Sequence, residues 1–294
     1  MKFSRLMLGT VQFGLRYGIN NRLGQPSPDD VAAILRAAAD GGIDVLDTAR
    51  NYGDSEAVLG LALEKTGLAS HFRIISKIKR FPAGLAAADA PGWVENSITT
   101  SLKLLKRKSL DGLLLHHEDD LPFFALLETC RAKGYAEAIG VSLDSRQSLA
   151  AVAQVELMMA QLPGNIVDRR FFPLAEKLRR QGGAVFMRSV YLQGMLFKPE
   201  AEVHPALGPL LTVRKALEKL ARDAGIAPGE LYFRYMLGLT AADSILTGVD
   251  SVSQLRENLT LAARGVLPAD LIRAVDRVVP ELPENQVRPG NWPK

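Results

Sequence analysis

The sequence contains one cysteine, Cys130, among 294 residues. A single cysteine excludes an internal disulfide framework, so a reducing compartment such as the cytoplasm is expected. The N-terminal residues lack the apolar run and small-residue cleavage site of a signal peptide. No stretch approaches the roughly 20 apolar residues of a membrane-spanning helix. We therefore expect a cytoplasmic protein that does not contact membranes.

A strong charge of either sign is also absent, since the formal net charge is only +4. The basic runs at 103–108 and 177–180 lie in amphipathic helical patterns with leucine at inward spacing, which is typical of a solvated helix face. Interleaved aromatic residues or a recognised nucleic-acid module do not accompany them. Nucleic acid is therefore not an expected partner, and the oligomeric state is left open.

Short β-branched or leucine-rich runs alternate with helical patterns along the whole chain. This order predicts a single-domain (β/α)8 TIM barrel over residues 1–294, without a linker or domain boundary. An open nucleotide-binding sheet is disfavoured, because the first turn, Gly9-Thr-Val-Gln-Phe-Gly14, lacks the G-x-G-x-x-G spacing. The expected strands are residues 6–11, 44–48, 73–78, 112–117, 138–143, 155–162, 184–190 and 244–249.

Four polar residues, Asp47, Tyr52, Lys77 and His116, lie at or just after the ends of predicted strands. In a barrel, the carboxyl ends of strands converge on one mouth. A tyrosine is a weak acid with a reference pKa of about 10, and a nearby lysine ammonium favours its phenolate. An aspartate keeps the lysine charged, and a histidine can position a substrate oxygen. The set predicts proton transfer to a carbonyl oxygen as a hydride reaches its carbon.

Each of these residues also has a structural interpretation. Asp47 could cap the turn after its strand, Tyr52 could pack in its loop, and His116 alone could be a core histidine. Lys77 is harder to explain in that way, because a buried lysine without a partner is costly. Their joint placement at strand ends favours a functional site.

Two other clusters contain side chains that could form a site. The run from His116 to Asp119 could suggest a metal, but neighbouring strand residues point to opposite faces and zinc sites usually need three suitably spaced ligands. We therefore predict no metal site. The pair Arg169-Arg170 could bind an anion, but the exposed start of a helix is the simpler interpretation.

The pattern Asp47-Thr-Ala-x-x-Tyr52-Gly, then Ser76-Lys77, then Asp111-x4-His116, resembles the aldo-keto reductase family in order and spacing. The resemblance spans nearly the full chain. It implies a barrel with a nicotinamide cofactor, usually NADP with NAD possible. It further implies that Tyr52 donates the proton, that Asp47 and Lys77 tune it, and that His116 orients the carbonyl of a small aldehyde, ketone or sugar.

The resemblance also implies cofactor contacts. Gly140-Val-Ser142 is similar to the motif whose serine holds the nicotinamide carboxamide, and Gln161 is similar to the glutamine that shares this task. The segment from Ser189 to Gly194 resembles the pyrophosphate turn, and the segment from Gly248 to Asn258 resembles the adenosine site at a helix N-terminus. The implied cofactor residues are Thr10, Asp47, Ser142, Gln161, Arg188, Ser189, Val190, Tyr191, Gly194, Lys198, Gly248, Asp250, Gln254, Glu257 and Asn258.

Three residues depart from the family pattern. Leu143 replaces an asparagine, so one carboxamide hydrogen bond is expected to be missing. Arg188 replaces an aromatic residue that stacks on the nicotinamide, and its charge should oppose the oxidised ring, so the reduced cofactor is expected to bind more tightly. Asp250 replaces a basic residue or serine near the 2′-phosphate, which leaves the choice between NADP and NAD open.

Two further functions remain as alternatives. A non-catalytic cofactor-binding barrel could regulate a partner, although such a protein would not need Tyr52. A metal-dependent hydrolase on the same barrel is the weaker alternative. Substrate identity is expected to depend on the loops 79–92 and 191–209, the second being a candidate lid, and on the tail 287–292.

Overall fold

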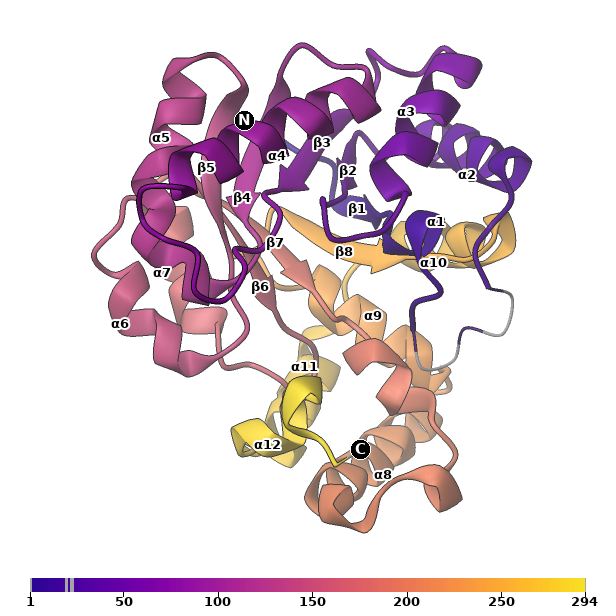
Figure 1. The fold of residues 1–294 in the computed structure, drawn as a ribbon. Coiled ribbons are helices and arrows are strands. Elements are labelled where there is room, and N and C mark those ends of the chain that lie inside the picture. The colour runs from indigo at the N-terminus through magenta and orange to yellow at the C-terminus, as the bar shows by residue number, and fades with distance from the viewer. Residues whose placement is uncertain (1, 19–20, 22–23, 294) are drawn as a thin grey trace.

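The computed structural model describes residues 2–18, 21 and 24–293. Eight parallel strands follow one another in sequence order around a closed barrel (Figure 1). The predicted (β/α)8 barrel is therefore confirmed. The strands are β1 (Leu6–Gly9), β2 (Val45–Asp47), β3 (Arg73–Lys77), β4 (Leu110–Leu115), β5 (Ala136–Ser142), β6 (Met159–Pro163), β7 (Ala184–Arg188) and β8 (Ser244–Gly248).

Helices connect the strands and surround the barrel. The first long helix shows why such segments form here: Ser27 and Asp30 make a reciprocal capping box, and Pro28 occupies the first turn. The α-helices are α1 (Val11–Gly14), α2 (Pro28–Asp40), α3 (Ser55–Thr66), α4 (Ala90–Leu105), α5 (Phe124–Ala132), α6 (Leu149–Val152), α7 (Phe172–Arg180), α8 (Gly208–Asp223), α9 (Pro228–Leu237), α10 (Val252–Ala263), α11 (Ala269–Val278) and α12 (Glu284–Val287). Short 3-10 helices are η1 (Glu118–Phe123), η2 (Arg146–Ser148), η3 (Leu192–Phe197), η4 (Glu200–Glu202), η5 (Pro205–Leu207) and η6 (Pro289–Asn291).

Several predicted strand boundaries were wrong by a few residues. The sixth strand begins at Met159 rather than at residue 155, because Val155 still belongs to the turn after α6, where its N–H donates to the Val152 carbonyl. The seventh strand ends at Arg188, because Ser189 adopts a left-handed φ of 65°. The fourth strand begins and ends two residues earlier than predicted, which places His116 just beyond it.

The barrel interior is filled by one buried side chain from each of the strands β1 to β7, together with Phe3, which precedes β1. Because side chains alternate between the two faces of a strand, the flanking residues pack outward against the helices. Ile74 belongs to the outer core, for example, whereas Ile75 belongs to the inner one. The inner cluster comprises Phe3, Met7, Val45, Ile75, Leu114, Ala138, Met159 and Phe186.

A second hydrophobic cluster lies beside the barrel, where α8, α11 and α12 gather in the orange and yellow part of the chain (Figure 1). The segment 191–209 contributes buried residues to it, including Leu192, Met195 and Leu207. This segment therefore has its own packed core contacts, and its role as a lid stays a prediction. Among the described residues, no helix is both long and apolar enough to cross a membrane.

Candidate active site

Three of the four predicted catalytic residues point to the same side of their strands as the residues that fill the barrel interior. Two residues beyond Val45, Ile75 and Leu114 in the inner cluster come Asp47, Lys77 and His116. Because alternate residues of a strand point to the same face, these polar side chains form the next layer toward the mouth of the barrel. Gln161 and Arg188 stand in the same relation to Met159 and Phe186.

The four predicted catalytic side chains lie together. The Lys77 ammonium donates to Asp47 Oδ1 at 2.5 Å, to the Thr48 carbonyl at 2.9 Å and to the Tyr52 hydroxyl at 3.2 Å. The His116 ring packs edge-on against the Tyr52 ring, with 5.5 Å between centroids. A phenol, an ammonium, a carboxylate and an imidazole from separate segments thus surround one point.

Burial and neighbouring charges shift the pKa values of Lys77 and Tyr52 in opposite directions. Burial would lower the pKa of Lys77, but Asp47 and Tyr52 raise this pKa above its usual value. Burial raises the pKa of Tyr52, and the Lys77 charge reverses only part of this increase. The Lys77 charge favours the phenolate, but burial outweighs it in the free protein, so the phenol stays protonated at neutral pH.

The loop that carries Tyr52 is held by buried polar contacts. Thr10 donates to the Asp47 carbonyl at 2.8 Å and shares a hydrogen bond with Ser55, so its side chain supports this loop and does not line the cavity. A Cβ atom on Gly14 would lie 1.9 Å from the Tyr52 carbonyl oxygen. Only glycine therefore lets α1 approach the tyrosine loop this closely.

The buried carboxylate of Glu56 also holds this region in place through hydrogen bonds. It accepts from the Ser76 hydroxyl at 2.6 Å and from Arg50 at 2.8 Å, and its side chain is fully buried. Ser76, which precedes Lys77, thereby links β3 to α3. This support fixes the strand end from which the lysine projects.

His116 is electrostatically unlike an ordinary surface histidine. Its Nδ1 atom is buried and has no hydrogen-bond partner in the structure. Burial lowers the pKa of its ring well below the usual value, and the charges of Lys77 and Arg188 lower it further. The imidazole is therefore neutral at neutral pH and can bind a substrate oxygen without carrying a charge.

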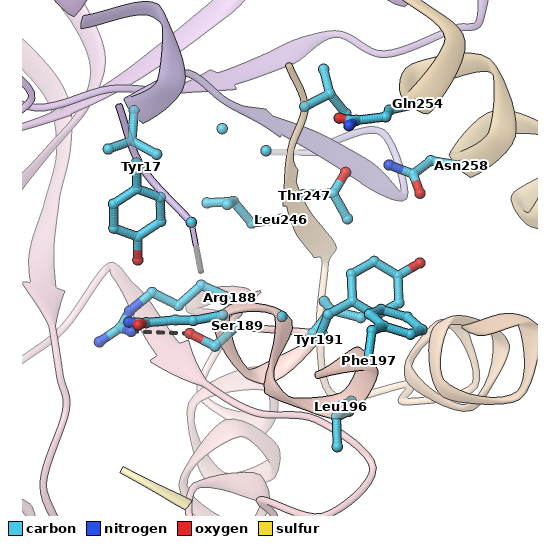
Figure 2. Close-up of a pocket in the computed structure, with 18 of the residues that line it drawn as sticks. Tyr17, Arg188, Ser189, Tyr191, Leu196, Phe197, Leu246, Thr247, Gln254 and Asn258 are labelled. Carbon is cyan, nitrogen blue, oxygen red and sulfur yellow. Dashed lines mark hydrogen bonds between the residues drawn. The ribbon is translucent and has the colours of Figure 1, made fainter. Parts of the chain in front are cut away.

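Three of the four predicted catalytic residues, Asp47, Tyr52 and His116, line one cavity of about 1420 Å³. Figure 2 shows Tyr17 and Arg188 at one end and Tyr191, Phe197, Gln254 and Asn258 at the other. Apart from Thr10, every predicted cofactor residue lines this cavity. These residues are Asp47, Ser142, Gln161, Arg188, Ser189, Val190, Tyr191, Gly194, Lys198, Gly248, Asp250, Gln254, Glu257 and Asn258.

The end of the cavity far from Tyr52 is suited to phosphate groups. Helix α10 begins there, with Ser251 as its N-cap, and backbone N–H groups at a helix start attract anions. Lys198 is half-exposed and lines the same cavity, and no ion pair involves it within the described part of the chain. Asp250 opposes this preference, although its Oδ1 accepts a hydrogen bond from Asn21 at 3.1 Å.

Two orphaned polar atoms test whether a dinucleotide fits this cavity. Gln12 Oε1 and His116 Nδ1 are buried without a partner, and both residues line the cavity. Such atoms are usually satisfied, so they indicate a missing ligand. A Cβ atom on Gly248 would lie 2.4 Å from Gln12 Oε1, so glycine is needed to make room for the Gln12 amide. The cavity residues fit a nicotinamide dinucleotide.

Several lining residues were missed from the sequence. Gln12, Tyr17, Arg80, His117 and Asp144 all line the cavity, but Gln12 lies in the short helix α1 and the others lie in segments beyond the strand ends. The alternation that reveals strand residues does not extend into these segments. No spacing signal could therefore have identified them.

The alternative clusters take structural roles. Arg170 was expected at an exposed helix start, but it is buried and grips Asp168 through two hydrogen bonds of 2.8 and 2.9 Å. His117 contacts Asp119 at 3.0 Å. Among residues 2–18, 21 and 24–293, no group of three or more His, Cys, Asp or Glu side chains is placed to hold a metal.

Comparison with known proteins agrees with this geometry. The model of the Aldo/keto reductase family matches residues 5–280, and the chain therefore belongs to that family. It is accordingly an oxidoreductase of the type that uses a nicotinamide cofactor.

Individual relatives are distant in sequence. L-galactose dehydrogenase of Arabidopsis thaliana is 26% identical over 274 residues, covering 86% of this chain and 84% of the relative. The uncharacterized oxidoreductase YqkF of Bacillus subtilis is 26% identical over 273 residues, covering 83% and 85%. The holo form of aldo-keto reductase AKR11C1 from Bacillus halodurans superposes with a TM-score of 0.78 at 20% identity, covering 98% and 96%. The last likeness shows the fold.

Proposed function

We propose that the protein is an NAD(P)H-dependent carbonyl reductase, or alcohol dehydrogenase in the reverse direction, acting on a small aldehyde, ketone or sugar. The observation that supports it most directly is the contact of Lys77 with both Asp47 and Tyr52 beside the cavity. A structural role for the lysine alone would not need a tyrosine hydroxyl at 3.2 Å facing open space.

The reaction divides between cofactor and protein. When bound, a reduced nicotinamide supplies the hydride that forms the new C–H bond at the carbonyl carbon. The Tyr52 hydroxyl gives its proton to the carbonyl oxygen, which yields the alcohol. Lys77 stabilises the phenolate left behind, and Asp47 keeps Lys77 charged. His116 orients the carbonyl oxygen beside Tyr52.

The residues proposed to hold the cofactor divide along the cavity. Ser142, Gln161 and Arg188 lie at the nicotinamide end, and Gln161 is tied to the site because its amide donates to Asp47 Oδ1 at 2.7 Å. Lys198 and the first turn of α10 lie at the phosphate and adenosine end. We propose NADP as the preferred cofactor, with NAD as the alternative that Asp250 favours.

The first test replaces Tyr52 with phenylalanine. General acid catalysis contributes about 10²- to 10⁴-fold, so kcat for carbonyl reduction should fall by that amount. The affinity for NADPH, measured by fluorescence titration, should change by less than about twofold, because one hydroxyl among many cavity contacts is removed. Full turnover in the variant would refute the catalytic proposal and favour a non-catalytic regulatory barrel.

A further inference from the structure

Arg188 is the one guanidinium that the last residue of a barrel strand brings to the catalytic end of the cavity. Its position is fixed: Nη2 donates to the Leu143 carbonyl at 2.7 Å and to Asp144 Oδ1 at 3.1 Å. Nη1 lies 3.3 Å from Ser189 Oγ (Figure 2). Burial raises the pKa of Tyr52 and lowers that of His116, and the charge of Arg188 acts on both groups in the lowering direction.

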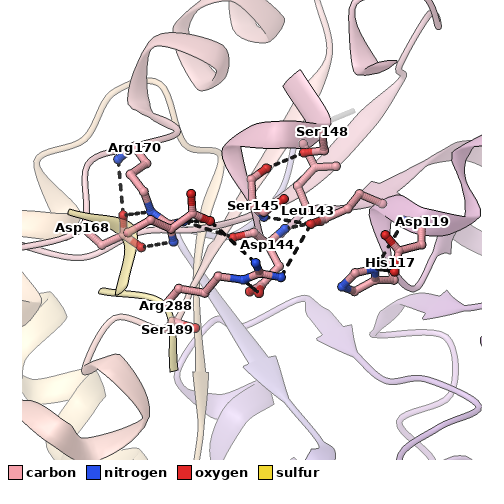
Figure 3. A network of polar contacts seen from close by, with 12 residues as sticks. His117, Asp119, Leu143, Asp144, Ser145, Ser148, Asp168, Arg170, Ser189 and Arg288 are labelled. Atoms are coloured by element: carbon pink, nitrogen blue, oxygen red, sulfur yellow. Dashed lines mark hydrogen bonds and ion pairs between the residues drawn. The ribbon is translucent and has the colours of Figure 1, made fainter. Parts of the chain in front are cut away.

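Asp144 faces a second guanidinium on its other side. Its Oδ2 accepts from Arg288 Nε at 2.6 Å, which ties the C-terminal segment to the loop after β5 (Figure 3). Burial would raise the pKa of Asp144, but Arg188 and Arg288 lower it below its usual value. The side chain is thus a carboxylate at neutral pH, shared between two cations.

The loop around Asp144 is held on every side, so this carboxylate cannot turn away from Arg188 without breaking several contacts. The backbone N–H groups of Asp144 and Ser145 both donate to the Glu118 carboxylate. The Asp144 carbonyl accepts from Arg170 Nη1 at 3.2 Å. Figure 3 shows Asp144, Arg170 and Arg288 in this arrangement. None of these contacts is needed to assemble Tyr52, Lys77 and Asp47.

We propose that Asp144 is a specificity-determining counter-charge, which sets through Arg188 how strongly the site discriminates between the oxidised and the reduced nicotinamide. This inference rests on the proposed cofactor-dependent function. The oxidised ring carries a positive charge and the reduced ring does not. An uncompensated Arg188 would repel the oxidised ring, and Asp144 reduces that repulsion, so both redox forms can bind.

The test compares dissociation constants of NADP+ and NADPH in the wild type and in Asp144→Asn. The asparagine is isosteric but removes the counter-charge. We expect the NADP+/NADPH ratio of dissociation constants to rise about five- to tenfold, the size of a partly screened charge interaction. Arg188→Gln should lower the same ratio, and in Arg188→Gln/Asp144→Asn the effect of the asparagine should vanish.

Asp223→Asn is the matched control, because Asp223 pairs with Lys219 on the exposed surface of α8, lies outside the cavity lining and has no contact with Arg188. It removes an equal charge and should leave the ratio unchanged within about twofold. An unchanged ratio in Asp144→Asn, or an effect that persists without Arg188, would overturn the inference. If Asp144→Asn does not fold, an NADP+/NADPH ratio of dissociation constants that is unchanged in Arg188→Gln would likewise overturn the inference. Failure of the wild type to bind either nucleotide would instead refute the proposed function.

Discussion

At the catalytic end of the cavity, Lys77 and Asp47 pair at 2.5 Å in full burial, whereas at the α10 end Lys198 is half-exposed and makes no ion pair among the described residues. The first arrangement is complete before any ligand arrives. The second leaves a cation and the start of a helix for a ligand to use. If the proposed function holds, the proton donor is preorganised by buried contacts, whereas cofactor choice depends on a few half-exposed charges.

The largest effect on this comparison should come from Lys77→Met. It removes the cation from a buried pair and leaves Asp47 uncompensated, which costs about 3–5 kcal/mol in the free energy of unfolding. Turnover should be lost as well, because the phenolate of Tyr52 loses its stabilising charge. Urea unfolding and kcat for carbonyl reduction measure the two effects.

A matched control separates burial from charge. Lys65→Met removes a cation paired with Asp29 at 2.6 Å, but both side chains are exposed. Surface pairs contribute little, so stability and turnover should both be retained. If Lys77→Met were as stable as Lys65→Met, the catalytic end would not be the preorganised region that the contacts indicate.

His116→Gln should change how stability depends on pH. The folded protein holds the pKa of His116 well below its unfolded value of about 6.5. As the pH falls below that value, the unfolded chain binds a proton at this histidine and the folded chain does not. The free energy of unfolding therefore decreases as the pH falls. The melting temperature of the wild type should fall more between pH 7.5 and pH 5.5 than that of the variant.

His204 provides the control, because it is an exposed histidine at the N-cap of η5. His204→Gln should leave the acid-dependent loss of the wild type intact. Equal acid sensitivity in the wild type and in His116→Gln would show that His116 is not held neutral by its surroundings.

The same contrast explains what could be predicted from the sequence. Asp47, Lys77 and His116 were identifiable because strand alternation and barrel geometry fix where such residues point. Asp144 and Gln12 were not, since Asp144 lies in a loop held by Glu118 and Gln12 lies in a four-residue helix packed beside Gly248, and neither segment is long enough to show a periodic pattern. The resemblance to a family located every predicted cofactor residue except Thr10 along the cavity, but it could not reveal that Arg188 is paired with a carboxylate.

The smallest expected effect concerns Asp250 at the α10 end. A carboxylate there should repel a 2′-phosphate, so Asp250→Asn should raise the NADP/NAD ratio of kcat/KM by about three- to tenfold, as for a partly exposed charge. Asparagine retains an oxygen that can accept from Asn21, whereas Asp250→Ser shortens the side chain and removes this tether. Equal rises in both variants would assign the effect to charge. A rise in the serine variant alone would assign it to loss of the hydrogen bond from Asn21, and an unchanged ratio in both would mean that Asp250 does not contribute to cofactor choice.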